Sequence, residues 1–455
     1  MATPSALLFH LFISIMSSLF SSPFRLRSSA LSKEHNILEE VSAIKQEIID
    51  NRRWFHANPE LSFKEFETAA KVADLLRSYG VDEVFENIAT TGVVGVIKGA
   101  TGGPCVALRA DMDALPVLET ATVAYKSKNE GVMHACGHDG HMASLLAAAK
   151  VLNASKEKIA GTIKLIFQPA EEGFGGAKVM IKEGVLNSTK FGPKVDCIYG
   201  IHLWSFSKLG QIGCQEGPIM AASDRFEIEV KGKGGHGAAP QGTVDAIVTS
   251  AHLVTSLQTV VSRNKDPLQS GVITCGTIEG GYGYNIIADK VKITGTTRSF
   301  TKDTQEMIKT RMNDICCGVA KTFGGECCLA YKYGYPPTVN AYPECVQVVK
   351  NAGSKIVGKS NACVPVKTMG AEDFSYFLEA IPGAFIFVGA ALPGEVRPHH
   401  KSVFDFDEDA MLVSASLYIQ IARDLLTPEV NDITPEAAEL SASSNKVDVG
   451  AVVNK

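Results

Sequence analysis

The stretch Met133-His134-Ala135-Cys136-Gly137-His138-Asp139-Gly140-His141 places a thiol, three imidazoles and a carboxylate in one short segment broken by glycines. A thiolate and an imidazole one residue apart can bind the same transition-metal ion, and an adjacent carboxylate such as Asp139 can orient a ligand. A buried structural cysteine beside surface histidines is the alternative. The metal interpretation is favoured because further ligand-type residues follow downstream in glycine-rich segments at predicted strand ends.

The composition is typical of a globular protein that folds without disulfide support. The chain has 455 residues, of which 45% are apolar, and a formal net charge of −5 at pH 7. A chain of this length usually contains more than one domain and can bury a large core. Lysine and arginine are scattered and no nucleic-acid-binding motif is present, so nucleic acid is not an expected partner.

The eleven cysteines leave the redox compartment open. The adjacent pairs Cys316-Cys317 and Cys327-Cys328 could bridge to one another on neighbouring elements, or they could remain buried free thiols, which we favour. The sequence contains no Cys-x-x-Cys motif, and this disfavours a redox protein that works through paired thiols.

Residues 1–30 are predicted to be a signal peptide, because an apolar stretch over residues 6–20 is followed by serine-rich sequence and small residues. No basic residue precedes the apolar stretch, whereas Arg25 and Arg27 follow it. An uncleaved anchor and an organelle transit peptide therefore stay open as alternatives. Once the leader is removed, no stable membrane span is expected.

The first large segment alternates helices with buried strands. Two helices are expected in residues 35–79, around a turn at Asn58-Pro59-Glu60. Apolar runs then predict strands at 93–97, 105–109, 162–167 and 197–201, with a helix at 142–152. Strands that alternate with helices and carry polar residues at their carboxyl ends predict an α/β sheet with a site along one edge.

A second pattern begins near residue 225. Residues 226–230 alternate apolar and polar side chains, which is typical of a half-exposed strand. The elements that follow are a helix at 245–261, strands at 271–278 and 290–297, a helix at 303–323 and a strand at 328–333. This β-α-β-β-α-β order predicts an inserted α+β domain of ferredoxin-like type.

The expected domain organisation follows from these patterns. The leader covers 1–30, the catalytic domain covers 31–218 and resumes at 336–427, and the inserted domain covers 219–335. Helices are expected at 343–357 and up to residue 426 in the resumed part. The tail 428–455 is rich in serine, glutamate and alanine and is expected to be disordered.

Residues able to bind metal recur at five strand ends or loops. They are Asp111 and Asp113, Cys136 and His138, Glu171 and Glu172, His202, and the pair His399-His400. Together they predict a dinuclear site, and mixed thiolate, imidazole and carboxylate ligands suit Zn²⁺, Mn²⁺ or Co²⁺. Two metal ions close together lower the pKa of a water molecule that they bind, and a base must then accept the proton of that water. In the Glu171-Glu172 pair one carboxylate can bind metal while the other moves the proton. The alternative interpretation of Glu171-Glu172 is the solvent-exposed N-terminus of a helix, without a role in metal binding.

At these residues the chain resembles the M20 peptidase family and, within it, the amidohydrolases of plant auxin (indole-3-acetyl-amino acid) conjugates. The resemblance runs from about residue 35 to 426. The matching motifs are Arg109-Ala110-Asp111-Met112-Asp113-Ala114-Leu115-Pro116, the stretch 133–141, Gln168-Pro169-Ala170-Glu171-Glu172-Gly173, Gly200-Ile201-His202, Gly234-Gly235-His236-Gly237-Ala238-Ala239-Pro240 and Gly370-Ala371-Glu372-Asp373-Phe374-Ser375. A chance match to all of them is not credible.

The resemblance implies a zinc-peptidase-like catalytic domain with a mixed sheet, helices on both of its faces, and an inserted lid. It implies two divalent metal ions, Mn²⁺ before Zn²⁺ or Co²⁺, with Cys136 bridging them. The implied metal ligands are Cys136, His138, Glu172, His202 and His400. His400 is preferred to His399 because the family's histidine stands four residues before an aromatic, here Phe404.

The resemblance also implies roles for residues that do not bind metal. Glu171 would be the general base, and Asp113 would orient a ligand, whereas Asp111 would be structural. His236 in the lid would polarise the scissile carbonyl after closure about hinges near Pro218 and Pro336. Asn285 and Arg298 would bind the carboxylate and carbonyl of the substrate, with a surface cation as the alternative for Arg298.

The expected function is a metal-dependent amidohydrolase that cleaves N-acyl amino acids, in particular indole-3-acetic acid conjugates, to release free auxin. Jasmonoyl or N-acetyl amino acids are alternative small-molecule substrates. A non-catalytic conjugate-binding protein would have no need of Glu171. The expected form is a monomer or homodimer. Plant relatives can end in a Lys/His-Asp-Glu-Leu retrieval signal, but this chain ends Val452-Val453-Asn454-Lys455, so the endoplasmic reticulum lumen and secretion both remain possible destinations.

Overall fold

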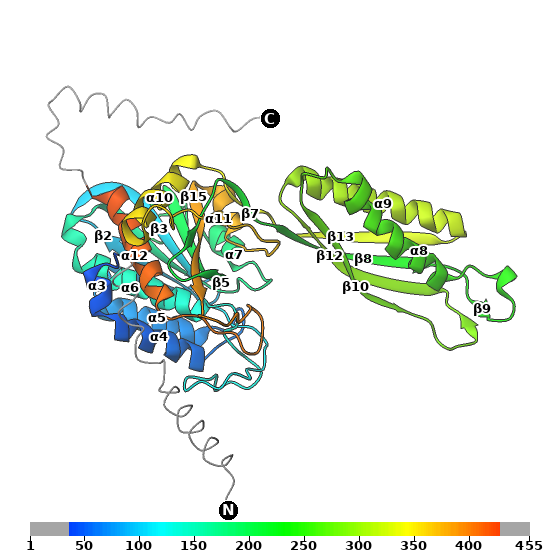
Figure 1. The fold of residues 1–455 in the computed structure, drawn as a ribbon, viewed down its shortest axis with the longest axis horizontal. Coiled ribbons are helices and arrows are strands. Elements are labelled where there is room, and N and C mark those ends of the chain that lie inside the picture. The colour runs from blue at the N-terminus through cyan, green and yellow to red at the C-terminus, as the bar shows by residue number, and fades with distance from the viewer. Residues whose placement is uncertain (1–35, 428–455) are drawn as a thin grey trace, which may run out of the picture.

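The computed structural model describes residues 36–427, so the predicted signal peptide and the predicted tail lie outside the described residues. The described chain forms a large α/β domain and a small α+β domain that projects from it, as Figure 1 shows. This is the predicted fold class, a mixed α/β catalytic domain carrying an inserted ferredoxin-like domain.

A seven-stranded mixed sheet organises the large domain, in the order β1-β2-β4-β3-β5-β15-β6. The strands are β1 (Glu83–Ile88), β2 (Gly92–Lys98), β3 (Thr101–Asp111), β4 (Ala160–Gln168), β5 (Cys197–Lys208), β6 (Ile212–Gly213) and β15 (Gly383–Ala391). The four central strands β4, β3, β5 and β15 run parallel, and the strands at both edges run antiparallel. The carboxyl ends of the parallel strands therefore meet at one edge of the sheet.

The central strands are buried on both faces, which explains their continuous apolar sequences. In β3, Val106 and Leu108 pack into one hydrophobic core, whereas Cys105 and Ala107 pack into the other. Most of the helices cover the first face: α3 (Glu39–Ala43), α4 (Lys45–Ala57), α5 (Phe66–Ser78), α6 (His138–Ala154), α10 (Pro343–Val357) and α12 (Ala410–Leu426). Helices α7 (Gly176–Glu183) and α11 (Ser375–Ala380) cover the second.

The small domain has a four-stranded antiparallel sheet in the order β10-β12-β8-β13. Its strands are β8 (Ala222–Lys231), β10 (Gly271–Gly280), β12 (Lys290–Ser299) and β13 (Glu326–Tyr335). Helices α8 (Ala246–Thr259) and α9 (Lys302–Phe323) pack against one face, where Phe226, Ile228 and Val230 are buried. Arg225 and Glu227 alternate with these residues and point to the face that no helix covers.

The chain crosses between the domains twice, in β7 (Gly217–Met220) and β14 (Thr338–Asn340). These two short strands pair antiparallel, with Met220 opposite Thr338. The connection is therefore a two-stranded ribbon that includes Pro218 and lies two residues after Pro336, near which the sequence predicts hinges.

The structure corrects several local predictions. Residues 36–79 form three helices, because the chain breaks between α3 and α4 at Ile44. Strands β1 and β15 were not expected at all. Helix α6 begins at His138 rather than at residue 142, and β5 continues past His202 to Lys208. All eleven cysteines are free thiols, so the two adjacent pairs do not bridge, but Cys317 and Cys328 are exposed rather than buried as expected. Within residues 36–427, no helix combines the length and the apolar character that a bilayer crossing requires.

Glu65 anchors the turn that carries the Glu171-Glu172 pair. Its carboxylate is fully buried and accepts hydrogen bonds from the Thr91 hydroxyl and from the backbone N–H of Ala170 at 2.9 Å. Ala170 has a φ of +55°, a left-handed conformation unusual for alanine, so this bond holds a strained turn. Burial raises the pKa of Glu65 to about 7, with hydrogen bonding opposing and the charge of Asp113 adding to the rise.

Replacing Glu65 by Gln should change how stability depends on pH. Between the ordinary carboxyl pKa of about 4.3 and the raised folded value, the folded protein binds more protons than the unfolded chain, so the wild type loses stability as pH rises. The amide of Gln has a donor and an acceptor, like the protonated form of Glu65, but it carries no charge at any pH. Its Tm relative to wild type should therefore increase from about pH 5 to about pH 8. Glu67→Gln, at an exposed position on α5, is the control. A Tm difference for Glu65→Gln that is equal at both pH values would contradict this account.

Candidate metal centre

The Cys136-His138 segment meets β5 because two glycines allow a tight turn and close packing. Gly137 has a φ of +97° and caps α6 in the left-handed conformation that residues with a Cβ rarely adopt. A Cβ on Gly140 would lie 2.5 Å from side-chain atoms of both Leu203 and Phe406. Glycine at this position thus lets the start of α6 approach the strand that carries His202.

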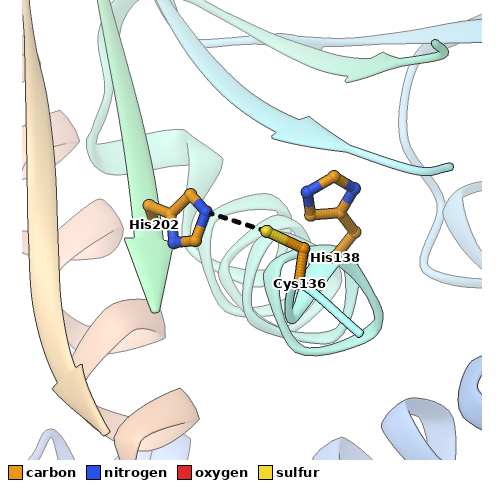
Figure 2. A group of neighbouring side chains, drawn as sticks. All are labelled: Cys136, His138 and His202. Atoms are coloured by element: carbon orange, nitrogen blue, oxygen red, sulfur yellow. Dashed lines mark hydrogen bonds between the residues drawn. The ribbon is translucent and has the colours of Figure 1, made fainter. Parts of the chain in front are cut away.

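Two sets of three ligand-type residues lie at this edge of the sheet and share Cys136. The first set is Cys136, His138 and His202, and the second is Cys136, Glu172 and His400. Within each set the candidate ligand atoms all lie within 4.8 Å of one another. Figure 2 shows the sulfur of Cys136 pointing toward His202, whose Nε2 lies 3.5 Å from it, with His138 beside them.

The tautomers of the two buried histidines aim lone pairs at the shared centre. His202 Nδ1 lies 2.7 Å from the carbonyl oxygen of Leu203, and His138 Nδ1 lies 2.8 Å from that of Asp113. A carbonyl only accepts, so each Nδ1 must carry a proton, and in the neutral ring each Nε2 keeps a lone pair. Backbone carbonyls hold metal-binding histidines in this way in many proteins.

Two buried polar atoms of the sets lack a hydrogen-bond partner among the described residues. They are His138 Nε2 and Glu172 Oε1, which lie 4.0 Å apart; His400 Nε2 lies 3.3 Å from Glu172 Oε1 but forms no hydrogen bond with it. A buried acceptor without a donor costs roughly 1–3 kcal/mol, more if it is charged. A divalent cation between these atoms would satisfy both, so the residues fit a metal.

The charge balance also fits a cation. Burial lowers the pKa of His138, but Asp111 and Asp113 raise it to about 10, so without a metal ion Nε2 binds a proton in the place that a cation would take. Burial raises the pKa of the Cys136 thiol well above its ordinary value, and the charges of Glu172 and Glu171 raise it further. A thiolate at Cys136 therefore needs a positive charge next to it, which a metal ion supplies.

Glu171 lies beside the two ligand sets that share Cys136 and belongs to neither of them. A carboxylate oxygen of Glu171 lies within 4.8 Å of the ligand atoms of His138 and Glu172, and its side chain is 5% exposed. Burial raises its pKa well above the ordinary value, and the negative charges of Glu372, Glu172 and Asp373 raise it further. Glu171 is thus a carboxylate with an unusually high affinity for a proton, next to the candidate metal position.

Asp113 positions the loop that carries both glutamates. Its two carboxylate oxygens accept the backbone N–H groups of Glu171 and Glu172, each at 3.0 Å, and one also accepts the Ser62 hydroxyl at 2.6 Å. The backbone carbonyl oxygen of Asp113 also accepts a hydrogen bond from Nδ1 of His138. Asp113 therefore orients residues on both sides of the candidate centre.

A buried hydrogen-bond network around Arg109 supports the site, although no role was expected for Arg109 from the sequence. The Arg109 guanidinium donates to Asp111 at 2.8 Å, to Glu372 at 2.9 Å and to Gln168 at 2.8 Å. Asp111 in turn accepts from His141 Nδ1 at 2.6 Å, and His141 Nε2 accepts the N–H of Leu203. Both nitrogens of His141 are used, so it is not available to a metal. The signal for this network was present in the matched motifs that contain Arg109, Gln168 and Glu372.

Asp139 does not orient a metal ligand, contrary to the expectation from the sequence. Its carboxylate bonds Arg52 Nε at 2.8 Å and His56 Nδ1 at 2.8 Å. Because Asp139 is the second residue of α6, its side chain turns toward α4 rather than toward the sheet edge. Asp139 therefore fastens α6 to α4, and the carbonyls described above hold the ligands instead.

The geometry favours His400 over His399 as the late ligand. His400 Nε2 lies 3.3 Å from Glu172 Oε1, and its backbone N–H donates to the carbonyl of Ala135 at 2.7 Å. His399 instead stacks on Trp204, with ring centroids 4.9 Å apart, and its Nε2 accepts the N–H of Ser205. A φ of +63° at His400 turns the two neighbouring side chains to different surroundings.

The three candidate residues of the small domain lie at two different places. His236 is exposed in β9 (Gly235–His236), which pairs with β11 (Ile286–Ile287), and the carbonyl of Asn285 accepts the N–H of Gly237. Figure 1 shows β9 at the end of the small domain remote from the large one. Arg298 is near the opposite end of β12, close to the interdomain ribbon. The structure thus does not bring His236 or Asn285 to the metal ligands.

Tyr335 links the small domain to the glutamate loop. Its hydroxyl donates to the carbonyl of Glu171 at 2.6 Å and accepts the N–H of Gly175 at 2.9 Å. Tyr335 is the last residue of β13, immediately before Pro336. A rotation of the small domain about the ribbon would therefore act directly on the backbone of Glu171.

Comparison with known proteins identifies relatives along nearly the whole described chain. The model of peptidase family M20/M25/M40 matches residues 107–424. The putative amidohydrolase YhaA of Bacillus subtilis is 43% identical over 392 residues, which cover 86% of this chain and 96% of that protein. The IAA-amino acid hydrolase ILR1-like 4 of Arabidopsis thaliana is 40% identical over 381 residues, covering 82% of this chain and 84% of that protein. The N-acetyl-L-cysteine deacetylase of Bacillus subtilis is 38% identical over 395 residues, covering 87% and 92%.

The solved structures include a similar fold with a described metal site. The YxeP protein of Bacillus subtilis, described as a dinuclear metal binding peptidase from the M20 family, superposes with a TM-score of 0.73. It is 32% identical, and the match covers 85% of this chain and all of that chain.

Metal should protect Cys136 from alkylation if both ligand sets bind. Iodoacetamide should label Cys136 in chelator-treated protein at alkaline pH and should fail to label it after reloading with Mn²⁺ or Zn²⁺, because a coordinated sulfur is no longer a free nucleophile. Peptide mass spectrometry measures the labelling site by site. The exposed Cys317 and Cys328 are internal controls that should react equally in both states. Equal labelling of Cys136 in both states would remove it from the ligand set.

Proposed function

This chain belongs to peptidase family M20/M25/M40, and we propose that it is a metal-dependent amidohydrolase that cleaves the amide bond of N-acyl amino acids. The observation that carries the proposal is the pair of ligand sets that share Cys136, with the proton-binding Glu171 beside them. The relatives named as an amidohydrolase, a deacetylase and an IAA-amino acid hydrolase support the same reaction class.

Two divalent ions would be held by Cys136, His138 and His202 on one side and by Cys136, Glu172 and His400 on the other. When bound, such a pair lowers the pKa of a water and polarises the scissile carbonyl. The description of YxeP as a dinuclear metal binding peptidase supports two ions. We propose Mn²⁺ as the activating metal, with Zn²⁺ or Co²⁺ as alternatives, since mixed thiolate, imidazole and carboxylate ligands accept all three.

Glu171 would act as general base and then as general acid. It takes a proton from the attacking water onto its carboxylate and returns that proton to the amide nitrogen as the amine leaves. Its burial next to other carboxylates suits the interval between these steps, because the protonated form is favoured there. Asp113 and Tyr335 keep the backbone of Glu171 in place through the bonds described above.

We further propose that the acyl group is indole-3-acetyl, so that hydrolysis releases free auxin. The identity of 40% to an IAA-amino acid hydrolase supports this choice. Deacetylation of N-acetyl amino acids is the competing choice, supported by the identity of 38% to an N-acetyl-L-cysteine deacetylase. A conjugate-binding protein without catalysis is disfavoured, because a binder has no use for a buried carboxylate beside the metal ligands.

Closure about the β7–β14 ribbon would bring the small domain over the candidate metal centre and exclude water, and His236 would reach the scissile carbonyl only after such a movement.

We also propose that the chain enters the secretory pathway, because residues 1–30 have the pattern of a signal peptide. Fusion of residues 1–30 to a fluorescent reporter, followed by imaging and sequencing of the mature N-terminus, tests entry into the secretory pathway.

Glu171→Gln should separate catalysis from metal binding. Gln keeps the size of the side chain but cannot take a proton, so turnover should fall by about 10²–10⁴-fold while metal content stays at two ions per chain. Turnover and metal content are measured on the same preparation. The exposed Glu157→Gln is the matched control. If Glu171→Gln also loses an ion, Glu171 is a ligand and not the base.

Activity should require metal and should identify the acyl group. Purified protein is stripped with a chelator, reloaded with Mn²⁺, Zn²⁺ or Co²⁺, and tested for release of free acid from indole-3-acetyl, jasmonoyl, benzoyl and acetyl amino acids. We expect no release without metal and fastest release from the indole-3-acetyl conjugates. Release only from the other series would keep the reaction class and reject the auxin proposal. No release with any metal would reject the proposed function.

A further inference from the structure

The helix-free face of the small-domain sheet carries a cationic hollow. Its volume is about 670 Å³, within the range of small-molecule pockets. Strands β8, β10, β12 and β13 all contribute to it, and Arg225, Arg298 and Lys332 are among the residues that line it. Of these three cations, only Arg298 was expected from the sequence to bind substrate.

This hollow extends to the loop that carries the proposed metal ligand Glu172. A second pocket of about 100 Å³ shares Arg225 and Lys332 with the first and is also lined by Gly173. A Cβ built on Gly173 would lie 3.6 Å from Arg225 Nη2. Gly173 directly follows Glu172 in the chain, so the guanidinium of Arg225 borders the loop that carries this proposed metal ligand.

The three cations lack carboxylate partners in the part of the chain that the structure describes. None of them forms an ion pair within residues 36–427. Glu227 also lines the hollow, but Lys292 pairs with it at 2.7 Å. Asp224, the nearest other carboxylate in sequence, accepts instead from Gln305, Tyr331 and the N–H of Gly334.

The cations also lie close to one another, which is unfavourable without an anion between them. Lys332 is directly opposite Arg225 in the β13–β8 register, and like charges at such a pair destabilise a sheet. Burial lowers the pKa of Arg298; Asp224 opposes this effect, and the positive charge of Arg225 adds to it. A bound anion would relieve this repulsion.

The substrate class of the proposed function identifies the anion. In indole-3-acetyl, jasmonoyl, benzoyl and acetyl amino acids the acyl half carries no charge, so any carboxylate belongs to the amino acid that is released. One carboxylate is common to all such substrates, and aspartate and glutamate add a second. Guanidinium groups bind carboxylates in a bidentate manner, and an ammonium supplements them as a point charge. Three cations around one hollow therefore suit a dicarboxylate better than a monocarboxylate.

Building on the proposed function, we infer that Arg225, Arg298 and Lys332 form a subsite for the released amino acid, and that the enzyme prefers conjugates of aspartate and glutamate to conjugates of neutral amino acids. Arg225 and Lys332 determine this preference, because they border both the hollow and Gly173.

The test compares matched charged and neutral substrates on the metal-loaded enzyme. The kcat/KM is measured for aspartate and asparagine conjugates, which have nearly the same size, in the indole-3-acetyl, benzoyl and acetyl series. We expect the aspartate conjugate to be favoured by about tenfold or more, because its second carboxylate can form charge-assisted hydrogen bonds with these cations. The single variants Arg225→Gln and Lys332→Gln, both at exposed positions, should each lower the ratio of aspartate to asparagine, mainly through KM.

Lys290→Gln removes an exposed cation at the far end of β12 and should leave the ratio unchanged. Equal kcat/KM for the two conjugates in wild type, or variants that slow both conjugates equally, would overturn the inference while leaving the amidohydrolase proposal intact. Absence of hydrolysis in every acyl series would instead reject the proposed function itself.

Discussion

The excess of buried carboxylates at one edge of the large sheet is the constraint on which the rest of the structure depends. Asp111, Asp113, Glu171, Glu372 and Asp373 are all at most 5% exposed. Burial of a charge costs several kcal/mol unless it is paired and hydrogen-bonded. Arg109 compensates part of this charge, because its guanidinium reaches Asp111, Glu372 and Asp373 at 2.8 to 3.2 Å. The remaining negative charge, together with a shared cysteine and inward-facing histidine lone pairs, is what two divalent cations would neutralise.

Much of the fold followed from apolar runs, but one central strand did not. The order of the four long strands and two helices of the small domain matches the prediction, because its amphipathic period is clear in residues such as 226–230, whereas the two-residue strands β9 and β11 were not expected. Strand β15 was missed, although its residues are almost all buried. It lies between β5 and the short edge strand β6, and a short run of small and apolar residues has no period that distinguishes a strand from a helix.

The candidate ligands could be chosen from the sequence by chemical type, whereas their supporting contacts could not. Cys136, His138, Glu172, His202 and His400 are residue types that bind metal, and the structure brings them together. The bonds from Arg109 to Glu372 and from Arg52 to Asp405 join residues more than 260 positions apart. Such pairings depend on the topology of the sheet and helices, so no local pattern reveals them. The same holds for the orientation of Asp139 toward α4 and for the position of β9 far from the centre.

The central claim is that Cys136 is shared between two metal positions. Crystals grown with Mn²⁺ and measured at the manganese absorption edge would show each ion as a peak in an anomalous difference map. The account predicts two peaks on either side of the Cys136 sulfur, one next to His138 and His202 and the other next to Glu172 and His400. A single peak, or a peak bound by His399 or His141, would contradict it.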